Sequence, residues 1–185
     1  MAFALVGGLL LGCGAGADPG APNRSASHAP PPTHPASARM RASPAEYYAF
    51  RLRPGQDLKQ ELAAFAKTNR LRAGFVASAV GSLTDVHLRY ANQDAGARLT
   101  GHFELLSLSG TLAEDGMHVH LSVADSAGRT YGGHLLDGNL VYTTVELVVG
   151  EATDLRFGRE VDSTFGYREL TVARRRRGPG QAPRR

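Results

Sequence analysis

Hydrophobic and polar residues alternate along most of the central part of the chain, which is the pattern of strands that bury one face. Between the first two alternating runs, apolar residues instead recur at helical spacing from Leu58 to about Arg70. Asp57 stands directly before this segment and can cap its amino terminus. Eight runs are predicted to be strands, at residues 46–53, 75–80, 86–90, 102–112, 117–124, 129–135, 140–149 and 165–172.

These patterns predict an α+β domain over residues 46–172. Its sheet is expected to be compact and mainly antiparallel, and either to curl or to split in two, because eight strands are many for one open sheet of this size. The single convincing helix is amphipathic, and its apolar stripe is interpreted as core packing.

The two ends of the chain lack the composition of a folded core. Residues 14–45 hold seven of the ten prolines, together with many alanines, serines and glycines. Such a segment cannot bury enough apolar surface to offset its ordering entropy, so we predict a disordered, flexible tether. Residues 173–185 contain six arginines and no acid, and we expect this tail to be disordered as well.

Residues 1–13 resemble the signal peptide of a bacterial lipoprotein. The apolar run Phe3–Leu11 is too short to span a bilayer, and it leads to Cys13, the only cysteine of the chain. Leu10-Leu11-Gly12-Cys13 matches the box in which such a cysteine is lipidated, so we expect a membrane anchor and a place in the cell envelope. No Lys or Arg precedes the apolar run, however. A misassigned start codon would explain this departure. An accidental apolar end is the alternative to a signal peptide, and the alternative location is the cytoplasm.

The charge of the chain is distributed unevenly. Of a total of +4, the tail 173–185 carries +6 and residues 1–44 carry +2, so the segment 45–172 carries −4. An acidic domain argues against a nucleic-acid site on its own surface. Contacts to DNA phosphates are expected only from the tail, at Arg174, Arg175, Arg176 and Arg177. A solvated basic end without a partner is the alternative, and the tail lacks the Arg-Gly-Arg-Pro core of an AT-hook.

Three histidines are the candidate site. His118 and His120 are two residues apart in a strand-like run, so both imidazoles project from the face opposite its apolar residues. A short turn at residues 125–128 can fold the next strand back and bring His134 beside them. Three imidazoles on a rigid sheet suit a zinc ion with one open position. The alternative is a set of half-exposed strand histidines that bind nothing, and Gly132-Gly133 is interpreted as a bulge or a close backbone approach beside His134.

Glu146 is a weaker candidate. Alternation places it on one face of the strand 140–149, followed directly by Leu147, Val148 and Val149, so we expect it to be partly buried. It could support a metal ligand or act as a general base, while an ordinary glutamate facing water is the alternative. No Gly-x-Ser-x-Gly motif is present and Cys13 lies outside the domain, so nothing favours a serine or cysteine nucleophile.

The histidine motifs resemble those of a known family, the plant and prokaryote conserved (PPC) domain. The resemblance rests on Gly116–Ser122, Gly132–Leu135 and Thr143–Glu146, and on the opening segments Tyr47–Gly55 and Gly74–Leu83. It spans about residues 46–172. It implies a compact α+β fold that assembles as a homotrimer, and it adds weight to a metal site at the three histidines. In plants the domain accompanies AT-hooks in nuclear DNA-binding proteins, whereas prokaryotic members mostly stand alone.

Three functions are consistent with these observations. The first is a non-enzymatic, homotrimeric binding module that holds a metal or small ligand near His118, His120 and His134. The second is a DNA-associated regulator whose trimer presents three arginine tails. The third is a zinc-dependent enzyme of unknown substrate with Glu146 as base. We rank them in that order.

Overall fold

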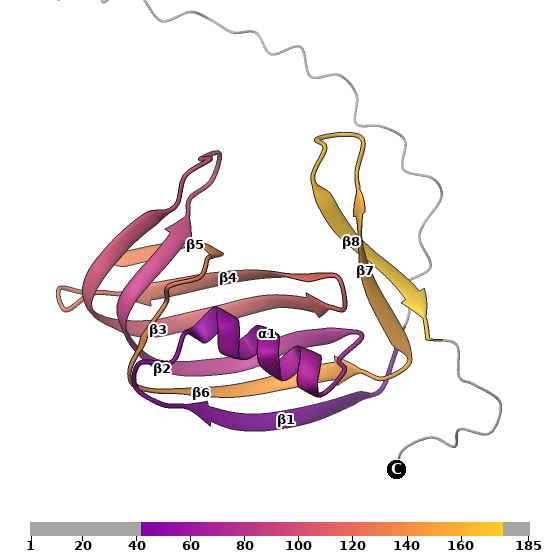
Figure 1. Cartoon of the computed structure of the whole chain (residues 1–185), viewed down its shortest axis with the longest axis horizontal. Helices are drawn as coiled ribbons and strands as arrows, with labels where there is room; N and C mark the ends of the chain where they lie inside the picture. The colour runs from indigo at the N-terminus through magenta and orange to yellow at the C-terminus, as the bar shows by residue number, and fades with distance from the viewer. Residues whose placement is uncertain (1–41, 176–185) are drawn as a thin grey trace, which may run out of the picture. The chain divides into compact units, whose positions relative to one another are not determined.

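The computed structural model describes residues 42–175 and confirms the predicted α+β fold with a mainly antiparallel sheet and one helix (Figure 1). Its elements are β1 (Ala45–Leu52), α1 (Leu58–Thr68), β2 (Gly74–Arg89), β3 (Ala97–Ala113), β4 (Gly116–Ala124), β5 (Thr130–Leu135), β6 (Val141–Ala152), β7 (Leu155–Val161) and β8 (Arg168–Arg174).

Six strands form one sheet in the order β1-β6-β2-β3-β4-β5, and every pair in it is antiparallel. The end of β2 also pairs with β5, through Leu88 and Arg89, so the sheet curls back on itself. Strands β7 and β8 form a separate two-stranded sheet. The sheet therefore both curls and splits, the two outcomes that the number of strands predicted.

The helix covers one face of the six-stranded sheet. The Asp57 carboxylate accepts hydrogen bonds from the amides of Lys59 and Gln60, which confirms the predicted cap. Leu58 and Leu62 are fully buried in the main core. Truncating such a leucine to alanine costs about 2–5 kcal/mol of stability. The helix is therefore held to the sheet mainly by its apolar stripe, as its spacing predicted.

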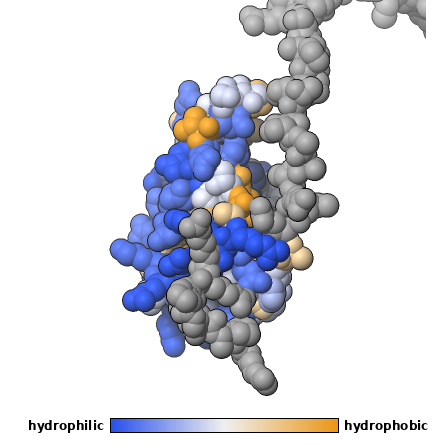
Figure 2. Space-filling view, turned by 90° about the vertical axis from the view of Figure 1, so that its right-hand side faces the viewer, coloured by the Kyte–Doolittle hydropathy of each residue, from blue (hydrophilic) through white to orange (hydrophobic). Residues whose placement is uncertain are grey.

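The opposite face of the sheet, here called the outer face, is not covered by α1. Its strand positions alternate with the buried ones, and several large apolar side chains on it are exposed. These are Tyr47 on β1, Val80 on β2, Leu106 on β3 and Tyr142 on β6. Figure 2 shows the side of the domain on the right of Figure 1, where separate apolar residues stand among mostly hydrophilic ones.

Two strand predictions are wrong. The runs 75–80 and 86–90 belong to one long strand, β2, and Gly81 does not end it. Gly81 instead has φ of +147°, and a Cβ there would collide with the carbonyl oxygen of Thr144 on β6, so only glycine allows this close approach. Strand β7 was not predicted, although Leu155, Phe157 and Val161 alternate with charged residues and glycine along it. The run predicted at 165–172 forms β8, which begins at Arg168 and extends to Arg174.

The predicted signal-like segment 1–13, most of the tether 14–45 and most of the tail 173–185 lie outside the described residues. Ala45 opens β1, and Ala173 and Arg174 lie in β8. Between residues 42 and 175, no helix is long and apolar enough to cross a membrane.

Candidate metal centre

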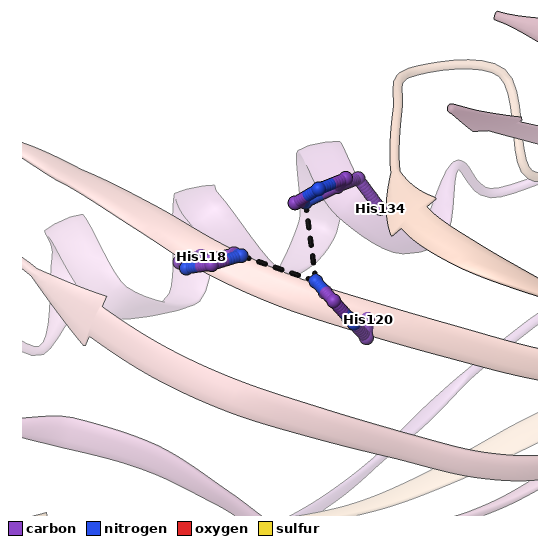
Figure 3. Close-up of side chains that lie close together, drawn as sticks. All are labelled: His118, His120 and His134. Atoms are coloured by element: carbon purple, nitrogen blue, oxygen red, sulfur yellow. Dashed lines mark hydrogen bonds between the residues drawn. The ribbon is translucent and has the colours of Figure 1, made fainter. Parts of the chain in front are cut away.

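Three histidines meet on the outer face of the sheet (Figure 3). His118 and His120 project from β4, where they alternate with buried residues that face the core. His134 projects from β5, which pairs with β4 in a register that sets His120 directly opposite His134. The structure therefore brings together all three residues that the sequence proposed as ligands.

The nearest ring nitrogens are separated by distances that suit a shared metal ion. His118 Nε2 lies 3.1 Å from His120 Nε2, and His120 Nε2 lies 3.2 Å from His134 Nδ1. Two nitrogens bound tetrahedrally to one zinc ion at about 2.05 Å would lie about 3.3 Å apart. Both pairs that involve His120 thus have a separation that suits a shared zinc ion, and the candidate ligand atoms of all three residues lie within 4.8 Å of one another. The same separations also suit hydrogen bonds between neutral rings.

The surroundings favour the neutral form of two of these imidazoles. Burial lowers the pKa of His118 below its usual 6.5, and neighbouring positive charges, Arg159 among them, lower it further, while the Glu169 carboxylate acts in the opposite direction. Burial also lowers the pKa of His134, followed by the charge of Arg89. Neutral imidazole is the form that binds a metal ion, so the lowered pKa values of His118 and His134 favour the form that could act as a ligand.

A close approach between β5 and β2 shapes one side of the cluster. A Cβ at Gly133 would lie 2.6 Å from the carbonyl oxygen of Arg89, so a side chain there is excluded. This confirms the close backbone approach predicted for the glycine pair. The pairing places Arg89 directly opposite His134. Sequence reasoning missed Arg89, because the pairing joins segments far apart in the chain.

Arg159 on β7 lies on another side of the cluster and was also missed. Its side chain reaches Thr111, whose hydroxyl oxygen accepts a hydrogen bond from Arg159 Nη2 at 2.6 Å. Thr111 lies directly opposite His118 in the β3–β4 register. Arg159 is only 9% exposed, and in the described part of the chain it forms no ion pair and its Nε has no acceptor.

Glu146 lies apart from the histidines. It is on β6, directly opposite Arg51 and Val80, and is exposed, so the expected partial burial is wrong. Strands β2 and β3 separate β6 from β4, which puts Glu146 on the order of 14 Å from the cluster along the sheet. Within one chain, the structure therefore does not bring Glu146 to the three histidines.

The remaining candidate residues lie at the ends of the chain. Cys13, Arg176 and Arg177 are outside the described residues. Arg174 is exposed in β8, and the Arg175 amide donates a hydrogen bond to the carbonyl oxygen of Asp154. Lipidation and DNA contacts therefore stay predictions.

Comparison with known proteins shows relatives in sequence and in fold. The chain is 49% identical to a hypothetical protein from Salmonella of known structure, with a TM-score of 0.72, over 74% of this chain and 99% of that one. It is 45% identical over 164 residues to the bifunctional protein GlmU of Synechococcus sp. (strain JA-3-3Ab). This alignment covers 89% of the chain but only 25% of the relative, so the chain spans about a quarter of the GlmU length.

The fold is also that of the metal-containing protein from Archaeoglobus fulgidus, with a TM-score of 0.61 and 24% identity over 71% of this chain and 99% of that one. The family model of the Plants and Prokaryotes Conserved (PCC) domain matches residues 40–153. This range includes the strands that carry the three histidines and the Gly132-Gly133 approach. The chain therefore belongs to the PCC-domain family, the one that its histidine and glycine motifs resemble.

Proposed function

We propose that the chain is a non-enzymatic, homotrimeric binding module that holds a zinc ion at His118, His120 and His134. The observation that carries this proposal is the pair of nitrogen separations, 3.1 and 3.2 Å, within one cluster. His118 and His120 are exposed, so a fourth coordination position would face solvent and could accept a small ligand. The description of the Archaeoglobus fulgidus relative as metal-containing adds support.

Metal content tests this proposal. The purified full-length chain should contain about one zinc ion per chain by elemental mass spectrometry, and His120→Ala should lose it. His102→Ala is a matched control, because the His102 ring packs on Tyr142, with centroids 4.3 Å apart, and is not part of the cluster. Equal metal content in the wild type and His120→Ala, or a metal-free wild type, would contradict the proposal.

Two observations support assembly into a trimer. The outer face exposes Tyr47, Val80 and Leu106 by more than half of their surface, and large exposed apolar side chains are typical of surfaces that another subunit covers. The second is the resemblance to the PPC domain, which implies that the assembly is a homotrimer.

Two alternatives are less well supported. For a zinc-dependent enzyme, the proposed base Glu146 lies apart from the cluster. For a DNA-binding regulator, two of the four arginines concerned, Arg176 and Arg177, lie outside the described residues. Duplex binding measured by fluorescence anisotropy at several salt concentrations tests the latter, with Arg174→Gln and Arg175→Gln expected to weaken it and reduce its salt dependence.

A further inference from the structure

Two arginines flank the histidine cluster. Arg89 lies directly opposite His134 in the β2–β5 pairing. Arg159 is bonded through Nη2 to Thr111, which lies directly opposite His118 in the β3–β4 pairing. Side chains directly opposite each other in an antiparallel pair lie on the same face, about 5 Å apart at their Cβ atoms. Both arginines are therefore neighbours of the proposed ligands.

The charge of Arg159 is not balanced by the described part of the protein. Only 9% of the Arg159 surface is exposed. Nevertheless, no carboxylate of residues 42–175 forms an ion pair with it, and its Nε has no hydrogen-bond acceptor among these residues. The nearby Asp115 carboxylate accepts from the backbone amide of Arg159 and from the side chain of Arg168 instead. A buried charge without a counter-charge is costly, and such groups are normally paired. Among residues 42–175, the Arg159 guanidinium therefore has no counter-charge within ion-pair distance.

Arg89 also forms no ion pair with any of residues 42–175. The hydrogen bond recorded for its side chain runs from Nη1 to the carbonyl oxygen of Gln93, a neutral acceptor, at 3.2 Å. A divalent cation bound at the histidines would add two further positive charges to this region. An anion bound together with it would offset that repulsion.

We propose that the cluster binds its metal together with a small oxyanion, and that Arg159 is the main binding residue for that anion. One oxygen of the anion takes the open coordination position, and another accepts hydrogen bonds from the Arg159 guanidinium, with Arg89 adding charge from the other side. This inference rests on the metal site proposed above. It assigns the class of ligand that the open position accepts, a carboxylate or a sulfate-like group.

A reciprocal coupling between metal and anion follows. If both bind side by side, each must tighten the binding of the other by the same factor. Typical couplings between sites are about 5- to 150-fold, and we expect at least about fivefold here. The coupling separates binding from a structural role, because an arginine that only holds the β7–β8 hairpin would alter stability without linking the metal to an anion.

Cobalt(II) is a suitable probe, since its visible spectrum reports its ligands. The full-length chain is titrated with cobalt(II) alone, with acetate and with sulfate, while perchlorate keeps the ionic strength constant. We expect the spectrum to shift with acetate, sulfate or both, and cobalt to bind at least about fivefold more tightly when the anion saturates. The comparison of the acetate titration with the sulfate titration shows whether the site prefers a planar carboxylate or a tetrahedral anion.

Variants assign the effect to Arg159. In Arg159→Gln the coupling should fall below about twofold, while cobalt binding without anion is unchanged or tighter because a repelling charge is gone. Arg159→Lys should keep part of the coupling, and Arg89→Gln should reduce it. Arg156→Gln is the matched control, because Arg156 lies on the same strand but pairs with the exposed Glu114 at 3.4 Å.

The outcomes that overturn the inference are distinct from those that overturn the metal site. Cobalt binding without any anion effect, or an equal coupling in the wild type and Arg159→Gln, overturns the oxyanion site and leaves the metal site standing. Failure of the wild type to bind cobalt overturns both. If Arg159→Gln does not fold, the test uses Arg159→Lys and Arg89→Gln instead. The inference is overturned if the anion tightens cobalt binding in both variants as much as in the wild type.

Discussion

His120 on β4 and His134 on β5 lie directly opposite each other, and their nearest ring nitrogens are 3.2 Å apart. The short hairpin between the two strands sets this pairing, and the alternation along β4 places His118 on the same face. A rigid sheet therefore holds three imidazoles together without help from a loop. Such an arrangement could hold a metal ion.

The first prediction concerns a chelator. If the histidines hold a metal jointly, a chelator should lower the melting temperature of the wild type, because a bound metal stabilises the folded state in proportion to the logarithm of its excess over the dissociation constant. The same chelator should leave the melting temperature of His134→Ala unchanged. Calorimetry checks both, with His102→Ala responding like the wild type. An equal response in the wild type and His134→Ala would show that the cluster holds no metal.

The second prediction concerns pH in the metal-free protein. The pKa values of His118 and His134 are lowered in the folded state, chiefly by burial. As the pH decreases below about 6.5, the unfolded chain therefore takes up protons before the folded domain does. The free energy of unfolding should then decrease as the pH decreases, whereas above about pH 6.5 these two histidines should cause no such loss. Urea unfolding at pH 7.5 and 5.5 measures the loss. A double variant, His118→Gln with His134→Gln, should lose less free energy of unfolding between the two pH values than the wild type does. An identical loss in the wild type and the double variant would argue against the lowered pKa values.

The third prediction concerns Glu146. Because β2 and β3 separate it from the histidines, Glu146→Gln should change zinc affinity by less than about twofold. Replacing a residue that supports a metal ligand directly costs about 10- to 100-fold. Competition with a chromogenic chelator measures the affinity. A tenfold loss would return Glu146 to the site and strengthen the case for a zinc-dependent enzyme.

The fourth prediction concerns assembly. Light scattering of the purified chain should give three times its mass of 19.6 kDa. Leu106→Glu should dissociate the trimer, because it places a charge on an outer-face position that is 54% exposed in the single chain. Ser126→Glu, in the exposed turn between β4 and β5, is the control and should stay assembled. A wild type that is monomeric at micromolar concentration would end the proposal.

The fifth prediction concerns the amino terminus. If Cys13 is lipidated, Cys13→Ser should move the protein from the membrane fraction to the soluble fraction. Mass spectrometry of the wild type should then find Cys13 as its modified first residue. A soluble wild type that still carries residues 1–11 would contradict the lipoprotein hypothesis, and it would bring the DNA-binding alternative back into consideration.

The sequence alone was sufficient for features that depend on neighbouring residues. Helical spacing and Asp57 predicted α1, and strict alternation predicted the β4–β5 hairpin and its three histidines. Both patterns are local, because a helix or a hairpin buries its own apolar face within a few residues of the chain. For the same reason the motifs around the histidines were enough to indicate the family.

Only the tertiary structure decided what depends on contacts between distant segments. Gly81 looks like the end of a strand, yet the close approach of β6 makes it part of β2. The pairing of β2 with β5 brings Arg89 to the cluster, and the fold of β7 brings Arg159, while the strand order keeps Glu146 away. Alternation assigns a residue to a face but not to a neighbour, since the neighbour is set by which strands pair and in which register.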